Sequence, residues 1–238
     1  MKLGDDRREL VNRTGIIHAL DVDNLDRAIE IAREVEPFVD AIKVSWPTVM
    51  DFGIRQVIPA IKGSVKLPII ADFKVADIPE ISTQIVHKAV RWGADGITLQ
   101  GFVGEVTMRA CIEEAKKSDA YTFMVTEMSH RGAEKFMQPH GEEIALMARK
   151  LGSYGIVAPA TRPERTRFYR RVIGPDVKIM SPGVGPQGGQ LGDAILAGAD
   201  FEVIGRRIFM ADSPGSEAKK FAEKIAEIKQ KLPSIRVS

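Results

Sequence analysis

The sequence of 238 residues is long enough for one large domain or two small ones. Its 44% hydrophobic and 28% charged residues exclude intrinsic disorder and a collagen-like fold. Because 34 lysines and arginines balance 32 aspartates and glutamates, the formal charge of +2 excludes a broad cationic surface for nucleic acid or an anionic membrane. We therefore expect a small-molecule partner, and neither nucleic acid nor a membrane.

The predicted elements, in chain order, begin with a short helix from Asp5 to Asn12. The N-terminal residues lack the apolar core of a signal peptide, and no apolar run approaches the ~18 residues of a membrane span. Eight short apolar runs then predict strands, which start near Ile16, Ala41, Leu67, Gly96, Tyr121, Gly155, Val177 and Phe201. After each run, apolar residues recur every three or four positions, which predicts a helix.

The alternation of strands and helices predicts parallel strands joined by right-handed crossovers. Eight such units in 238 residues match the size of a (β/α)8 TIM barrel, an α/β fold. We expect residues 1–238 to form one such domain, with the N-terminal helix covering the bottom of the barrel. A doubly wound open sheet is the alternative, although no Gly-x-Gly-x-x-Gly turn follows the first strand.

Cysteine and histidine usage argues against disulfides and zinc. Cys111 is the only cysteine, so the chain can form no intrachain disulfide, and we expect a cytoplasmic location. The four histidines show no paired spacing suited to zinc. His130 and His140 lie in the long segment 129–141 after the fifth strand, which we expect to be a binding loop or lid whose histidines are solvated.

Charged side chains interrupt several strands near their carboxyl ends, where a barrel places its chemistry. The first strand ends at Asp21, and the second carries Lys43. The third carries Asp72 and Lys74, which alternation puts on one face, and Asp77 follows in the loop. The fifth strand runs into Thr126, Glu127 and Ser129. Because buried charges cost several kcal/mol each unless they are paired, this array predicts either a structural ion network or a working site, and we favour the site.

The last two units predict a phosphate site. A glycine-rich loop from Ser181 to Gly189 follows the seventh strand, and Ile204-Gly-Arg-Arg ends the eighth. Glycine backbone N–H groups and an arginine between these two loops bind phosphate in many barrels. If the eighth strand continues through this sequence, only one of Arg206 and Arg207 points inward.

Seven blocks in this order resemble the orotidine 5′-monophosphate decarboxylase family: ALDVDN, IKVSWP, ADFKVADIP, TEMSHRGAE, ATRPER, SPGVGPQGG and IGRRIF. The resemblance implies a barrel that converts orotidine 5′-monophosphate to uridine 5′-monophosphate and CO2 in pyrimidine biosynthesis, with no cofactor and no metal, as a homodimer. The Asp-x-Lys-x-x-Asp core is shared with Mg²⁺-dependent hexulose-phosphate synthase and ketogulonate-phosphate decarboxylase, which are the alternative. A catalytically inactive barrel that binds a nucleotide is a third reading.

Carried over to this sequence, the resemblance implies that Lys74 protonates C6 of the pyrimidine. Asp72 and the Asp77 of the neighbouring subunit would flank it. Lys43 would hold Asp72 and a ribose hydroxyl, and Asp21 would also contact the ribose.

The resemblance assigns the remaining substrate contacts to the loops after the fifth, seventh and eighth strands. Ser129 would bind the pyrimidine edge, and Gln187 would bridge base and phosphate. Arg206 and the Gly205 backbone would hold the phosphate. The apolar lining would come from Pro182 and Val184. Arg207 has no matching role.

Three positions depart from the family pattern. Ile81 stands where the family usually has a threonine that contacts the partner's ribose. Thr98 and Gln100 replace an apolar residue and a histidine on the fourth strand. We expect these two to make the pocket around the departing carboxylate more polar.

Overall fold

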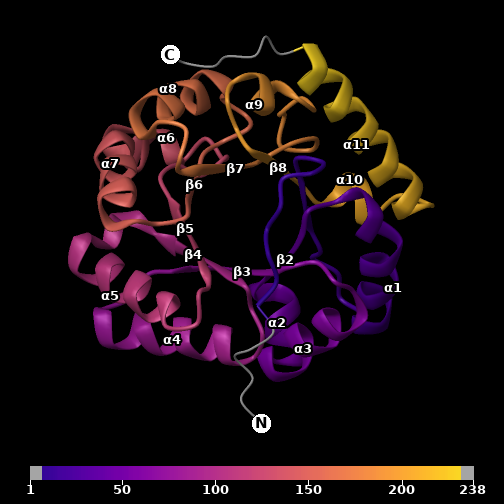
Figure 1. Cartoon of the computed structure of the whole chain (residues 1–238), viewed down its shortest axis with the longest axis horizontal. Coiled ribbons are helices and arrows are strands. Elements are labelled where there is room, and N and C mark those ends of the chain that lie inside the picture. Colours follow the sequence, from indigo (N-terminus) through magenta and orange to yellow (C-terminus); the bar gives the residue numbers. More distant parts are fainter. Residues whose placement is uncertain (1–6, 232–238) are drawn as a thin grey trace.

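The structure is a computed structural model that describes residues 7–231, and its centre is a closed barrel of eight parallel strands in chain order (Figure 1). The strands are β1 (Ile16–Ala19), β2 (Ala41–Ser45), β3 (Ile69–Val75), β4 (Gly96–Gln100), β5 (Tyr121–Val125), β6 (Gly155–Val157), β7 (Lys178–Pro182) and β8 (Phe201–Ile204). Strand β1 pairs with both β2 and β8, which closes the sheet. The predicted barrel is confirmed, and the open-sheet alternative is wrong.

Helices surround the barrel on the outside (Figure 1). The α-helices are α1 (Leu25–Val35), α2 (Trp46–Phe52), α3 (Ile54–Ser64), α4 (Pro79–Arg91), α5 (Glu105–Lys116), α6 (Ala133–Phe136), α7 (Gly141–Leu151), α8 (Pro163–Ile173), α9 (Asp193–Leu196), α10 (Arg206–Phe209) and α11 (Pro214–Lys231). The 3-10 helices are η1 (Glu36–Phe38), η2 (Gly101–Val103) and η3 (Gln138–His140). Within residues 7–231, no helix combines the length and the apolar character needed to cross a bilayer.

The strands are buried on both faces, which explains their nearly continuous apolar sequences. Alternate residues belong to two separate core clusters. In β1, Ile17 joins the cluster that fills the barrel interior, whereas Ile16 joins the cluster between strands and helices. Both isoleucines are fully buried. The same alternation sends every second residue near a strand's carboxyl end toward the interior of the barrel mouth.

The helices are held against the barrel by one apolar stripe each, as α1 illustrates. Its cap is Asn24, whose side-chain Oδ1 accepts a hydrogen bond from the Arg27 backbone N–H at 2.8 Å. Its buried residues recur at helical spacing and are Ala28, Ile31, Ala32 and Val35.

The N-terminal segment does not form the predicted helix. Asp5 and Asp6 lie outside the described residues, and residues 7–12 are irregular. The segment is fixed by tertiary contacts instead: the backbone N–H of Arg8 donates to Asp95 at 2.8 Å, and that of Leu10 donates to the Tyr121 hydroxyl at 3.1 Å. Leu10 is buried in the cluster that fills the barrel interior, so the segment packs against the amino-terminal end of the barrel without being helical.

Candidate active site

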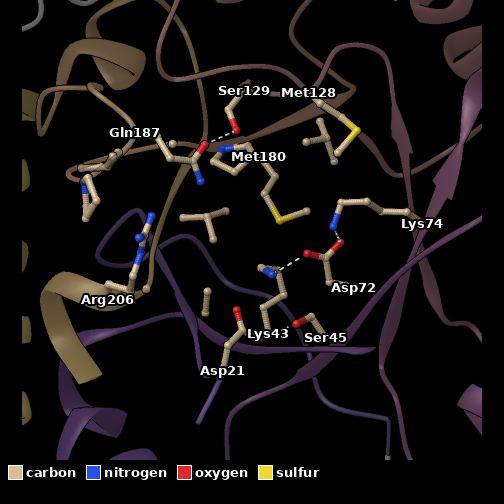
Figure 2. A pocket seen from close by; sticks show the side chains of 18 of the residues that line it. Asp21, Lys43, Ser45, Asp72, Lys74, Met128, Ser129, Met180, Gln187 and Arg206 are labelled. Carbon is tan, nitrogen blue, oxygen red and sulfur yellow. Dashed lines mark hydrogen bonds and ion pairs between the residues drawn. The ribbon is translucent and has the colours of Figure 1, made fainter. Parts of the chain in front are cut away.

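A cavity of about 490 Å³ lies at the carboxyl ends of the strands (Figure 2). Of the eleven site residues predicted from the sequence, all except Asp77 line it. These ten are Asp21, Lys43, Asp72, Lys74, Ser129, Pro182, Val184, Gln187, Gly205 and Arg206. The volume is in the range of cavities that hold a small molecule the size of a nucleotide.

The Asp72 carboxylate lies between two lysines. Lys74 Nζ is 2.8 Å from Asp72 Oδ1, and Lys43 Nζ donates a hydrogen bond to Asp72 Oδ2. The side chains of Lys43 and Asp72 are 7% and 9% exposed, but that of Lys74 is 33% exposed. These three residues form a charged chain, Lys43–Asp72–Lys74, and Lys74 is its member most open to a bound molecule.

The electrostatic interactions within this charged chain keep its two buried residues, Lys43 and Asp72, in their charged forms. Burial by itself would raise the pKa of the Asp72 carboxyl, but the charges of Lys43 and Lys74 outweigh burial and hold that pKa well below its ordinary value. Burial by itself would lower the pKa of the Lys43 ammonium, but Asp72 and Asp21 outweigh it and raise that pKa. The site therefore presents a fixed arrangement of charges to its ligand.

An irregularity in β3 sets the place of Lys74. The pairing with β4 shifts between Ala71 and Val75, and Lys74 has a φ of 44°. Such a bulge re-aims a side chain, and for a residue other than glycine the left-handed backbone costs roughly 1 kcal/mol. On the other side of the strand, the Trp46 indole donates to the Phe73 carbonyl at 2.8 Å and stacks on the Phe73 ring at 4.3 Å between centroids.

The first two strands add a polar edge that can bind hydroxyl groups. Ser45 Oγ donates to Asp21 Oδ1 at 2.6 Å, beside Lys43. Sequence reasoning missed Ser45, although it stands two residues after Lys43 and therefore on the same face of β2. It also missed Met128 and Met180, which line the cavity and contribute apolar surface.

The far end of the cavity holds Arg206 and Gln187, opposite Lys74 (Figure 2). Strand β8 ends at Ile204, so the prediction that it continues through both arginines is wrong. Both lie in the short helix α10, where Arg206 lines the cavity and Arg207 turns outward. The Arg207 guanidinium lies 4.6 Å from the centroid of the Phe221 ring.

The loop after β7 is tied to the loop after β5 and to β8. Ser129 Oγ donates to Gln187 Oε1, which joins the two loops across the cavity. At the other end of the β7 loop, the fully buried Glu202 accepts hydrogen bonds from the backbone N–H groups of Gly192, at 2.9 Å, and Ala194, at 3.0 Å. Burial raises the pKa of Glu202 to about 7, despite these hydrogen bonds. The stem of the loop is therefore anchored outside the cavity.

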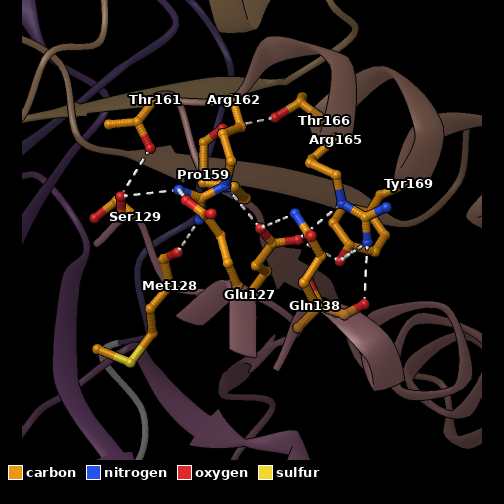
Figure 3. A network of polar contacts seen from close by, with 12 residues as sticks. Glu127, Met128, Ser129, Gln138, Pro159, Thr161, Arg162, Arg165, Thr166 and Tyr169 are labelled. Carbon is orange, nitrogen blue, oxygen red and sulfur yellow. Dashed lines mark hydrogen bonds and ion pairs between the residues drawn. The ribbon is translucent and has the colours of Figure 1, made fainter. Parts of the chain in front are cut away.

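Glu127 was grouped with the converging charges, but it does not line the cavity. It lies instead at the centre of a network of polar contacts (Figure 3). It is fully buried, and its two carboxylate oxygens lie 2.8 Å from Arg162 Nε and 2.9 Å from Arg165 Nε. Arg162 also donates to the Met128 carbonyl at 2.6 Å, and Thr161 Oγ1 donates to the Ser129 carbonyl at 2.8 Å. The network supports the backbone that carries Ser129 and is structural.

The segment 129–141 is folded for most of its length. It contains α6 and η3, and His130 and His140 are exposed, as predicted. By contrast, His18 is fully buried on β1, where its Nδ1 lies 2.9 Å from the Ile204 carbonyl oxygen and burial lowers its pKa to about 4. Among residues 7–231, no group of three or more histidine, cysteine, aspartate or glutamate side chains is arranged to hold a metal ion.

Asp77 is exposed at the start of the loop after β3 and does not line the cavity of its own chain. Its Oδ1 accepts a hydrogen bond from the Ile78 N–H at 2.7 Å. The neighbouring Ile78 and Ile81 are 60% and 41% exposed. The predicted site residue therefore stands on a partly apolar surface beside the cavity.

Thr98 and Gln100 are buried on β4 and are absent from the cavity wall. The expectation that they make the pocket more polar is therefore wrong. The Gln100 amide nitrogen lies 3.6 Å from the Met128 sulfur, and the Thr98 hydroxyl is bonded to Asp72.

Residues 14–221 match the family model for the orotidine 5′-phosphate decarboxylase / HUMPS family. The chain is 46% identical over 216 residues to an orotidine 5′-phosphate decarboxylase of Methanosarcina barkeri, an alignment that covers 90% of this chain and 96% of the relative. It is 42% identical over 213 residues to the Thermococcus kodakarensis protein of the same name, with 90% and 97% covered.

Solved structures agree with these relatives. The orotidine 5′-monophosphate decarboxylase of Methanocaldococcus jannaschii in complex with the inhibitor BMP superposes with a TM-score of 0.84 and 41% identity, covering 89% of this chain and 98% of that one. The orotidine 5′-phosphate decarboxylase of Pyrococcus horikoshii OT3 gives a TM-score of 0.80 and 38% identity, covering 89% and 99%.

Proposed function

Because the chain belongs to the orotidine 5′-phosphate decarboxylase / HUMPS family, we propose that it converts orotidine 5′-monophosphate to uridine 5′-monophosphate and CO2, as a carbon–carbon lyase of pyrimidine biosynthesis. One observation carries the proposal: a single cavity holds the Lys43–Asp72–Lys74 chain at one end and Arg206 with Gln187 at the other. A nucleotide offers a matching pair of ends, a reacting base and a phosphate. The relatives named above favour this reaction over the Mg²⁺-dependent sugar-phosphate chemistry of the family's other branch.

In the proposed mechanism, the bond between C6 and the carboxylate breaks, and its electron pair stays on C6 as CO2 leaves. No ring position delocalises that pair well, so the protein has to stabilise it electrostatically. Lys74 is the more exposed of the two lysines that contact Asp72, and its Nζ is held at 2.8 Å from the Asp72 carboxylate. Its ammonium stabilises the developing charge and then transfers a proton to C6, and the resulting amine regains a proton from water.

The other groups hold the nucleotide. Asp21 and Lys43 bind ribose hydroxyls, with Ser45 fixing the Asp21 carboxylate. At the base, Ser129 binds the pyrimidine edge. The bond between Ser129 and Gln187 supports a shared role in closing the site over the ligand.

The phosphate is bound by the groups at the far end of the cavity. Arg206 binds it together with the backbone of Gly205, and Gln187 bridges phosphate and base. Pro182 and Val184 provide apolar lining. Binding energy from this remote end is available to drive closure at the reacting end.

We propose that the active form is a homodimer in which Asp77 reaches the neighbouring cavity. Its exposure and its distance from its own cavity wall support this role. Exposed apolar side chains lie on the segments and helices that follow β2, β3 and β4, at Met50, Ile78, Ile81, Phe102 and Val106. Burial of this surface against a second copy would supply the hydrophobic contact that dimers need.

The proposed reaction is tested by mixing the protein with orotidine 5′-monophosphate and following the ultraviolet absorbance of the pyrimidine, with and without EDTA. We expect turnover at the same rate in both, because the mechanism uses only side chains of the protein. Activity lost on chelation and restored by Mg²⁺ would support the sugar-phosphate branch. Nucleotide binding without turnover would support an inactive barrel.

The proposed dimer predicts complementation between two inactive variants, Lys74→Ala and Asp77→Asn. In a hybrid dimer, one cavity receives an intact Lys74 from its own chain and an intact Asp77 from the other. Random pairing should then restore about one quarter of the wild-type rate, because half of the dimers are hybrids and each has one intact site. The measurement is the initial rate of co-expressed, separately tagged chains.

The control for this experiment is the doubly substituted chain co-expressed with wild type. Its hybrids have no intact cavity, so their purified fraction should be inactive. If Asp77 served its own chain's cavity, the two single variants would show no recovery when combined, and the intersubunit role would be refuted.

A further inference from the structure

The hydroxyl of Thr98 makes two hydrogen bonds directly beneath the reacting end of the cavity. Thr98 Oγ1 donates to Asp72 Oδ1 at 2.9 Å and accepts from the backbone N–H of Lys74 at 2.8 Å. Thr98 is fully buried on β4 and does not line the cavity, so it cannot touch a bound ligand. Both of its partners belong to the charged chain that the ligand meets.

The backbone of β3 explains why Lys74 needs this partner. Ala71 pairs with Ile97 and Val75 pairs with Leu99, so four steps along β3 face two steps along β4. The residues between them leave the regular ladder, and Lys74 takes a left-handed φ of 44°. Thr98 stands between Ile97 and Leu99, opposite this bulge. The Thr98 side-chain oxygen accepts a hydrogen bond from the Lys74 backbone N–H, which the irregular ladder leaves unpaired.

The donated bond fixes the carboxylate as well. Asp72 Oδ1 receives both the Thr98 hydroxyl and the Lys74 ammonium, and Oδ2 receives Lys43. The hydroxyl therefore restrains Asp72 as a third donor beside the two lysines. The Thr98 hydroxyl oxygen thus connects the backbone of Lys74 to the Asp72 carboxylate, which the Lys74 side chain also binds.

We propose that Thr98 is a positioning residue, which holds the strained backbone of Lys74 and the rotamer of Asp72 so that the Lys74 ammonium points at the reacting carbon. The inference rests on the proposed function, because it concerns the orientation of the proposed proton donor. Substrate binding depends mainly on the phosphate and ribose contacts, which lie elsewhere in the cavity. Loss of the hydroxyl should therefore affect the chemical step more than binding.

The test compares Thr98→Val with Thr98→Ser. Valine has nearly the same shape but leaves the Lys74 N–H and Asp72 Oδ1 without the hydroxyl, whereas serine restores it. We expect Thr98→Val to lower kcat for orotidine 5′-monophosphate by about 10- to 100-fold with KM changed less than about threefold, and Thr98→Ser to recover most of the rate. Circular dichroism checks that both variants fold.

The matched control is Thr122→Val on β5. Thr122 is also buried, and its hydroxyl is 3.1 Å from Ser153 Oγ, away from the cavity. We expect its kcat to stay within about twofold of wild type, since it touches no member of the charged chain. A wild-type kcat in Thr98→Val, or equal losses in Thr98→Val and Thr122→Val, would overturn the proposal.

Amide hydrogen exchange tests the same inference without activity. If Thr98 holds the Lys74 N–H, exchange at Lys74 should be at least about tenfold faster in Thr98→Val and unchanged in Thr122→Val. Should the wild-type chain fail to decarboxylate orotidine 5′-monophosphate, the proposed function would be lost, and exchange at Lys74 would still decide whether Thr98 fixes this backbone. Unchanged exchange would refute the positioning role.

Discussion

Replacing Lys74 with alanine is expected to lower kcat for orotidine 5′-monophosphate by at least about 10⁴-fold, because the variant loses both the nearest cation and the proposed proton donor. Asp72 keeps Lys43 and Thr98 as partners, so the rest of the site should stay in place. Uridine 5′-monophosphate should therefore still bind. Initial rates measure the first effect, and titration calorimetry with the product measures the second.

A control for Lys74→Ala is Lys66→Ala, which removes an exposed ammonium from the loop before β3 and should leave kcat unchanged. A Lys74→Ala variant with normal turnover would show that another group protonates C6. If the variant lost both turnover and product binding while remaining folded, Lys74 would be a structural support of the cavity rather than the proton donor.

The second large effect is expected at the opposite end of the cavity. Arg206→Ala should lower kcat/KM by about 10²- to 10³-fold, equivalent to about 3–4 kcal/mol, because charge-assisted hydrogen bonds to the phosphate are lost. Steady-state kinetics with orotidine 5′-monophosphate measure the loss. The nucleoside orotidine, which lacks the phosphate, should show almost no difference between variant and wild type.

Arg207 offers a closely matched control on the same short helix. Its guanidinium packs over Phe221 outside the cavity, so Arg207→Ala removes the same charge from the same turn without removing a ligand contact. We expect kcat/KM within about twofold of wild type for this variant. Equal losses at the two arginines would mean that charge near α10, rather than a direct contact by Arg206, supports the reaction.

Most of the barrel could be predicted because its signals are local. A strand buried on both faces reads as an apolar run, and an outer helix reads as an apolar stripe, so each of the eight strands begins within two residues of a predicted start. The N-terminal segment was mistaken for a helix because Arg8 and Leu10 are fixed by distant contacts, with Asp95 and Tyr121. Those contacts outweigh local helix propensity and leave no pattern in a short stretch of sequence.

The site was predictable to the extent that strand alternation determines it. Lys43 and Ser45 fall on one face of β2 because they are two residues apart, so this rule could have identified Ser45. Lys74 lies beside Asp72 through the bulge of β3 and not through regular alternation. The rule gave no means of separating Glu127 from the site residues, because its pairing with Arg162 joins residues 35 positions apart in the sequence. The bulge in β3 could not be predicted from the sequence either, because it depends on the pairing with β4.

The backbone conformation at Lys74 is one that its own side chain disfavours. A left-handed backbone at a residue with a Cβ carries a cost of roughly 1 kcal/mol that glycine would not incur. Selection for heat resistance alone would thus favour a different residue at the position on which turnover depends most. Efforts to raise the melting temperature would need to leave Lys74 unchanged, because a substitution that stabilised the fold at this position would also abolish catalysis.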